Sequence, residues 1–140
     1  MGALIDGYDV AMFDLDGVVY LGPEPVAGAV EGVTALQSRG VRTIYVTNNA
    51  ARPAQKVADQ LVGMGFHASV DDLVTSAQAA SGLMRRDLPA GARVLVAGTQ
   101  NLADHMTEAG FEVVSLASES PDAVVQGYDP QMTWPRLDEA

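Results

Sequence analysis

Short apolar runs alternate with segments of helical periodicity along the chain. The first run, Tyr8 to Phe13, is nearly continuous and has the length of a strand, which is typical of a strand covered on both faces. From Val26 to Arg39 the apolar residues recur at helical spacing, with Pro25 just before the segment and Gly40, a common helix stop, just after it. This part of the chain therefore predicts a strand followed by a helix.

The same alternation continues to the end of the sequence. We expect further strands at Val41 to Val46, Leu73 to Val74, Ala92 to Gly98, Phe111 to Val114 and Ala123 to Gly127. We expect further helices at Pro53 to Met64, Ala77 to Arg86 and Asn101 to Ala109, and the start of one more at Thr133. Strands and helices that alternate with short connections favour an α/β fold, in which a parallel sheet carries helices on its faces.

Two loops of this predicted sheet are the first places to look for a site. Ligands of open α/β sheets bind beyond the carboxyl ends of the strands. The sequence "DLDG", Asp14 to Gly17, follows the first predicted strand, and "TNNAARP", Thr47 to Pro53, follows the second. Both loops are therefore expected at the end of the sheet where ligands bind.

Composition narrows the classes of partner. With 140 residues, 48% of them hydrophobic, the chain can bury a core. The 18 acidic and 8 basic residues give a net charge of −10, which opposes binding to nucleic acid or to an anionic membrane and leaves a small molecule or another protein as partner. The absence of cysteine excludes disulfides, thiolate zinc sites and cysteine nucleophiles. No leader pattern or membrane-length apolar run occurs, so we expect a cytoplasmic protein.

Asp14 and Asp16 form the first candidate constellation. At i and i+2 of an extended chain they share one face, with backbones about 6–7 Å apart. Two carboxylates so close repel one another, and Mg²⁺ resolves the conflict because it is usually held by one or two carboxylates plus substrate phosphate oxygens. The alternative is a turn that ends the strand, with Gly17 at positive φ. A calcium-binding EF-hand loop is excluded because its twelfth position is Pro25 instead of glutamate.

The second constellation is "TNN". Thr47, Asn48 and Asn49 stand directly before a predicted helix, and by themselves they are an ordinary helix N-cap region. Arg52 has two interpretations: a contact to substrate or phosphate, or, as we expect, a solvated arginine in the first helical turn. By themselves these residues therefore do not distinguish a helix start from a binding site.

Both motifs together resemble the haloacid dehalogenase-like superfamily. The sequences "FDLDGVVYLG", then "YVTNNAARP" near thirty residues later, then "GMGF" resemble more narrowly its NagD-like branch of phosphatases, and "PDAVVQGYD" extends the resemblance along the chain. The branch contains p-nitrophenyl, phosphoglycolate, pyridoxal phosphate and glycerol-phosphate phosphatases. The resemblance implies a three-layer Rossmann-like core with a parallel sheet over residues 1–87. It also implies the first part of a large α/β cap domain over residues 88–140, with the "LPAGAR" stretch at the boundary.

The resemblance also assigns the catalytic chemistry. It implies a Mg²⁺-dependent hydrolase of small phosphorylated metabolites, in which Asp14 is the nucleophile and forms an aspartyl-phosphate. Asp16 would protonate the leaving oxygen and then take a proton from the attacking water. The metal ion would be held by the Asp14 side chain and the Asp16 backbone carbonyl.

Four further residues match the phosphate-binding positions of the family. Gly17 would let the backbone approach the phosphate. Thr47 matches the hydroxyl that binds the phosphoryl group, the backbone amide of Asn48 lies beside it, and Asn49 would order the loop.

The resemblance stops before the whole family pattern is complete. The family needs a later lysine and a later acidic pair, whereas the single lysine, Lys56, follows Thr47 by nine residues, and Asp122, Asp129 and Asp138 lie in the region that resembles the cap. We therefore expect the first half of a protein about twice as long, inactive by itself. Without the late strands, the strand that bears Asp14 would be an exposed, aggregation-prone edge.

Two alternatives to hydrolysis stay open at this point. A phosphotransferase or phosphomutase would use the same aspartyl-phosphate, and a catalytically incomplete phosphate-binding or oligomerisation module would keep the loops without the chemistry. Caps of this family often make dimer contacts, so a homodimer through the cap is a further expectation. Tyr128 and Trp134 are expected to pack within the cap.

Overall fold

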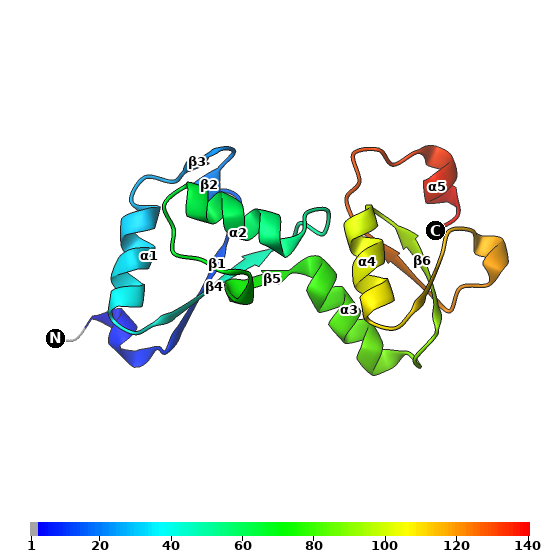
Figure 1. Ribbon diagram of the computed structural model, residues 1–140, viewed down its shortest axis with the longest axis horizontal. Helices are drawn as coiled ribbons and strands as arrows, with labels where there is room; N and C mark the ends of the chain where they lie inside the picture. Colours follow the sequence, from blue (N-terminus) through cyan, green and yellow to red (C-terminus); the bar gives the residue numbers. More distant parts are fainter. Residues whose placement is uncertain (1–2) are drawn as a thin grey trace. The chain divides into compact units, whose positions relative to one another are not determined.

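The computed structural model describes residues 3–140 and confirms the alternating α/β organisation (Figure 1). Chain contacts divide it into two units. The first unit holds the chain up to Thr47 together with Ala54–Val74, and the second holds Asn48–Pro53 together with Thr75–Ala140. The loop that follows Thr47 therefore belongs to the second unit, although the residues on both sides of it belong to the first.

A three-stranded sheet forms the centre of the first unit. It consists of β1 (Val10–Asp14), β4 (Arg42–Thr47) and β5 (Leu73–Thr75) in the order β1-β4-β5. β1 and β4 are parallel, with Val10 opposite Arg42 at one end and Asp14 opposite Val46 at the other. Parallel strands need a crossover, and α1 (Ala29–Ser38) provides it here and packs against β4.

The core of this unit gathers around Tyr45. On β4 the side chains of Thr43, Tyr45 and Thr47 are buried and alternate with more exposed neighbours, as the two-residue period of a strand requires. The Tyr45 ring lies 6.4 Å from the Phe13 ring and 6.3 Å from the Phe66 ring, measured between centroids. The helix α2 (Ala54–Gly63) adds Val57, Ala58 and Leu61 to this core.

The segment after β1 differs from its expected form. A small antiparallel hairpin of β2 (Tyr20–Leu21) and β3 (Glu24–Pro25) precedes α1, which begins at Ala29 instead of Val26. Gly28 has a φ of +82°, outside the helical region, so the helix cannot start earlier. Strands of two residues are too short to give an alternating pattern that a sequence could show.

β1 is an edge strand of the described sheet. Val10 and Met12 are exposed, Met12 by 68%, and no strand within residues 3–140 pairs with the outer side of β1. The expectation of a strand covered on both faces is therefore wrong for these residues, whereas the expectation of an exposed edge is confirmed.

The second unit is built around another parallel sheet. It contains β6 (Arg93–Ala97) between β7 (Glu112–Val114) and β8 (Ala123–Gln126). The helix α3 (Ser76–Asp87) packs against α4 (Gln100–Glu108), and a short α5 (Trp134–Asp138) follows β8. The contacts place α3 in this unit, so the division by packing begins at Thr75. The boundary between catalytic core and cap domain that the family resemblance implies, at residue 88, stays a prediction.

Two aromatic side chains of the second unit do not pack as expected. Trp134 is 83% exposed and Tyr128 is 71% exposed. Trp134 is the first residue of the short helix α5.

Three short 3₁₀ turns are also present within residues 3–140, at Leu4–Gly7, Val70–Asp72 and Ala117–Glu119. None of the helices in the described part of the chain is long and apolar enough to cross a membrane.

Candidate active site

Asp14 and Thr47 end two neighbouring parallel strands. Asp14 pairs with Val46 in the register of β1 and β4, so the last residues of both strands lie at the same carboxyl edge of the sheet. The Asp14 side chain is exposed, and its Oδ1 accepts a hydrogen bond from the Leu15 N–H at 2.9 Å. This bond orients a carboxylate that solvent and ligands can reach.

The "DLDG" segment turns around a buried leucine. Leu15 is fully buried, and its carbonyl accepts the N–H groups of Val19 at 2.9 Å and Tyr20 at 3.1 Å. The flanking Asp14 and Asp16 side chains are both exposed. The turn that the sequence left as an alternative is therefore present, and it leaves the carboxylates of Asp14 and Asp16 exposed.

Gly17 closes this turn in a conformation that favours glycine. Its φ is +82°, and its N–H donates to the Tyr20 carbonyl at 2.7 Å. A Cβ at this position would meet no atom of the described chain within 4 Å. Backbone conformation, and not crowding by the protein, is what requires glycine here.

Thr47 is buried, with 6% exposure, on the same face of β4 as Tyr45. Its successor Asn48 is exposed, and Asn49 is half-buried. The Asn49 Oδ1 accepts the Ala51 N–H at 2.8 Å, so this side chain closes a local turn within the loop.

Two side chains of the second unit hold the backbone of this loop. Ser76 Oγ, at the start of α3, donates to the Asn48 carbonyl at 2.9 Å, and Asn101 Nδ2, in the first turn of α4, donates to the Ala50 carbonyl at 2.7 Å. Sequence reasoning missed both contacts. Asn101 lies 51 positions after Ala50, and neither residue shows a local signal of the pairing.

The oxygen atoms of Asp14 and Asp16 provide some, but not all, of the ligands that a hard divalent cation needs. The part of the chain that the structure describes holds no group of three histidine, cysteine, aspartate or glutamate side chains able to bind a metal ion. Asp14 and Asp16 nevertheless offer two exposed carboxylates, and Mg²⁺ is commonly held by one or two carboxylates together with phosphate and water oxygens. The residues present therefore fit such an ion when a phosphate supplies further ligands.

Two titrating groups stand apart from the candidate residues. Burial raises the pKa of Tyr45 above its ordinary value of 10.0, Asp72 adds to the rise, and the Thr43 hydroxyl opposes it. In the second unit, the Gln131 backbone N–H and the Arg136 guanidinium hold the pKa of Asp129 below its ordinary value of 3.8.

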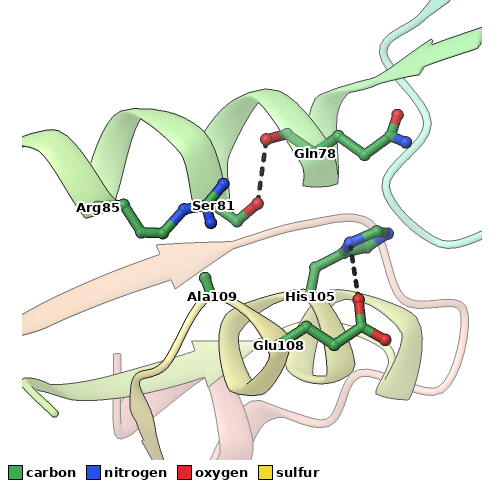
Figure 2. A pocket seen from close by; sticks show the side chains of 6 residues that line it. All are labelled: Gln78, Ser81, Arg85, His105, Glu108 and Ala109. Atoms are coloured by element: carbon green, nitrogen blue, oxygen red, sulfur yellow. Dashed lines mark hydrogen bonds and ion pairs between the residues drawn. The ribbon is translucent and has the colours of Figure 1, made fainter. Parts of the chain in front are cut away.

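A polar pocket of about 330 Å³ lies between α3 and α4 (Figure 2). Its lining consists of Gln78, Ser81, Arg85, His105, Glu108 and Ala109. The Ser81 hydroxyl donates to the Gln78 carbonyl at 3.0 Å, and His105 Nδ1 lies 3.9 Å from Glu108 Oε2, so both contacts are made within a single helix. None of the residues predicted for catalysis or phosphate binding lines this pocket.

Comparison with known proteins gives one consistent result. The family model described as haloacid dehalogenase-like hydrolase matches residues 11–112. The chain is 41% identical over 140 residues to the D-glycerol 3-phosphate phosphatase of Mycobacterium tuberculosis, a match that covers 100% of this chain and 39% of that protein. It is 35% identical over 133 residues to an acid sugar phosphatase of Staphylococcus saprophyticus, covering 95% of this chain and 50% of that protein.

Solved structures agree with the sequence matches. The glycerol phosphate phosphatase of Mycobacterium tuberculosis in complex with magnesium superposes with a TM-score of 0.91 at 40% identity, over 99% of this chain and 41% of that one. The p-nitrophenyl phosphatase from Archaeoglobus fulgidus gives a TM-score of 0.80 at 25% identity, over 93% and 48%. The chain thus spans half or less of the length of the curated relatives described above.

Proposed function

The chain belongs to the haloacid dehalogenase-like hydrolases, and on that premise we propose that the whole protein hydrolyses phosphomonoesters of small phosphorylated metabolites. One observation carries the proposal: Asp14 and Asp16 flank the buried Leu15 at the edge of the sheet where Thr47 also ends its strand. The relatives named above are phosphatases, which supports the same reaction class.

Asp14 is proposed as the nucleophile. One of its oxygens attacks the phosphorus atom, the bond between phosphorus and the ester oxygen breaks, and an aspartyl-phosphate forms. The Leu15 N–H on Oδ1 fixes the carboxylate plane, which leaves Oδ2 for the attack. Water then attacks the phosphorus of this intermediate, so that inorganic phosphate leaves and Asp14 is restored.

Asp16 is proposed as the general acid and base. In the first half-reaction it donates a proton to the leaving alkoxide, and in the second it takes a proton from the attacking water. Its exposed side chain, two positions after Asp14, suits both tasks because leaving group and water arrive from solvent. Such proton transfer contributes about 10²–10⁴ in rate.

Thr47, Asn48 and Asn49 are proposed to bind the phosphoryl group, and Gly17 is proposed to let the backbone turn close to it. Backbone N–H groups at a glycine turn and at the start of a helix are good donors to phosphate oxygens. The Gly17 N–H already donates to the Tyr20 carbonyl, which leaves Gly17 the role of shaping the turn. Thr47 offers its hydroxyl and Asn48 its backbone amide.

Mg²⁺ is the proposed cofactor, held by the Asp14 side chain and the Asp16 backbone carbonyl. When bound, it neutralises charge on the phosphoryl oxygens. The relative whose structure contains magnesium supports this choice of ion. The proposed substrate is a small polyol or acid phosphate, because the curated relatives are named for glycerol 3-phosphate and acid sugar phosphates. A net charge of −10 argues against nucleic acid as the partner.

The test is turnover of glycerol 3-phosphate and p-nitrophenyl phosphate by the whole protein with Mg²⁺. Asp14→Asn is expected to abolish both hydrolysis and the phosphorylated enzyme, because an amide cannot replace the carboxylate as nucleophile. Asp9→Asn is the matched control, since Asp9 is also exposed and lies just before the same strand. Full activity of Asp14→Asn would refute the proposal. Transfer of phosphate to an added alcohol, without free phosphate, would indicate a phosphotransferase instead.

A further inference from the structure

The loop after Thr47 is fixed by side chains that the phosphatase motifs do not include. Asn101 Nδ2 lies 2.7 Å from the Ala50 carbonyl, and Ser76 Oγ lies 2.9 Å from the Asn48 carbonyl. All four residues belong to the second unit. Both hydrogen bonds end on backbone oxygens, so they control the path of the chain and not a side chain.

These bonds determine where the loop amides point. No cis peptide occurs among the described residues, and in a trans peptide the carbonyl of one residue and the N–H of the next point in opposite directions. Holding the Asn48 carbonyl toward Ser76 therefore turns the Asn49 N–H away from α3. Holding the Ala50 carbonyl toward Asn101 turns the Ala51 N–H away from α4.

The Asn101 contact continues to the Asn49 side chain. The Ala51 N–H, which shares a peptide plane with the Ala50 carbonyl, donates to Asn49 Oδ1 at 2.8 Å. A chain of contacts thus runs from Asn101 through this plane to Asn49. Moving the Ala50 carbonyl would tilt the plane and break the hydrogen bond between the Ala51 N–H and Asn49 Oδ1.

Packing holds the same loop from a second direction. The Ala50 side chain is buried in the core of the second unit, together with Ala77, Leu102 and Met106. A Cβ at Gly127 would lie only 3.3 Å from the Ala50 Cβ. The space for Ala50 therefore depends on glycine at position 127, and the loop has little freedom to shift.

We propose that Asn101, assisted by Ser76, is a positioning residue for the phosphate-binding loop. It does not touch the substrate; it fixes the peptide plane between Ala50 and Ala51 and, through the Ala51 N–H, the Asn49 side chain, while Ser76 fixes the plane between Asn48 and Asn49. The inference rests on the proposed function, because a fixed loop conformation matters here only if the loop binds the phosphoryl group. Since the loop contacts the phosphoryl group in substrate and in transition state alike, loss of its position raises KM more than it lowers kcat.

Asn101→Asp is the sharpest variant for the test. It keeps the shape of the side chain and removes the N–H donor, and it adds a carboxylate to the first turn of α4, where negative charge strengthens a helix. Any effect on phosphate binding then does not come from a weakened helix. Gln100→Glu is the matched control, because it makes the same amide-to-acid change one residue earlier, where the side chain bonds to Asp104.

Two measurements on the whole protein test whether Asn101 positions the loop. The first gives KM for p-nitrophenyl phosphate and the inhibition constant of inorganic phosphate. The second gives amide hydrogen exchange at residues 49–52. For Asn101→Asp and Asn101→Ala we expect both constants to rise about three- to tenfold, the size of one lost hydrogen bond, with kcat changed less than twofold and faster exchange at residues 49–52. Ser76→Ala should give a smaller change in the same direction.

Each outcome bears on one of the two proposals. Unchanged constants in Asn101→Asp, or an equal rise in Gln100→Glu, would overturn the positioning role while the phosphatase proposal stands. A wild-type protein that hydrolyses no phosphomonoester would overturn the proposed function. In that case faster exchange at residues 49–52 in Asn101→Asp would still support the anchoring of the loop, and unchanged exchange would refute it.

Discussion

Arg136 Nη1 lies 2.9 Å from Asp129 Oδ2, and the second terminal nitrogen of the same guanidinium donates to the Gly98 carbonyl at 2.9 Å. One arginine in α5 therefore joins the ends of β6 and β8. The Asp129 side chain is only 9% exposed and also accepts the Gln131 N–H at 2.8 Å. These contacts are the reason that its pKa lies below the ordinary value.

Lowering the pH should reduce the stability of the second unit, because Asp129 becomes protonated. A lowered pKa in the folded state means that Asp129 stabilises the fold above its ordinary pKa of 3.8, and that this contribution is lost as the pH falls through the folded pKa. Asp129→Asn should lower the urea midpoint at pH 7, and the gap to wild type should close on acidification. Asp59→Asn, at an exposed position of α2, serves as control. A gap that stays constant with pH would contradict the prediction.

Raising the pH should reduce the stability of the first unit, because the buried Tyr45 hydroxyl ionises. Its pKa is raised because burial disfavours the phenolate, so the fold loses no stability through this group below the ordinary value of 10.0, and it loses stability as the pH rises above that value toward the folded pKa. Its buried hydroxyl has no hydrogen bond of good geometry within the described chain, although Thr43 lies close enough to oppose the pKa rise. Tyr45→Phe should therefore raise the free energy of unfolding at pH 7 by about 1 kcal/mol and reduce the alkaline loss. Thermal unfolding at pH 7 and at alkaline pH would check both, and a less stable variant at pH 7 would count against it.

Gly17→Ala should destabilise the protein for a purely conformational reason. With a φ of +82° and open space around the position, the substitution costs about 1–2 kcal/mol, the penalty of a left-handed conformation for an L-residue. Gly32→Ala is the matched control. It also has open space, but it lies within α1, where alanine should add about 0.5–1 kcal/mol. Opposite signs for the two variants in urea unfolding are the expected result, and equal signs would contradict it.

Met12→Lys should reduce self-association of the 140-residue chain. Met12 is an exposed apolar side chain on the edge strand β1, and a lysine there blocks pairing with another strand. Light scattering at increasing protein concentration would measure the change, with the exposed Leu83→Lys of α3 as control. Equal association of wild type and both variants would show that β1 is not the surface involved.

The sequence predicts most elements of this fold, because strand runs and helical periodicity are local. Asp14 and Thr47 could be placed at one sheet edge since a parallel sheet brings its carboxyl ends together. The start of α1 was missed because the φ of Gly28 is not visible in the residue pattern. Asn101 was missed because its partner, Ala50, is a backbone carbonyl far away in sequence, and any residue type supplies a carbonyl.

The second unit is not a continuous stretch of sequence, and this has a consequence for how such proteins can be recombined. A chimera that takes residues 75–140 from a relative would keep the original loop 48–53. The Ala50 methyl and carbonyl of that loop pack against and bond to the original α4, and they would then meet the α4 of the relative. The loop and the helix have to be inherited together. Substitutions at position 101 and in residues 48–53 should therefore be tied to each other during divergence, although a gene boundary drawn at Thr75 would separate them.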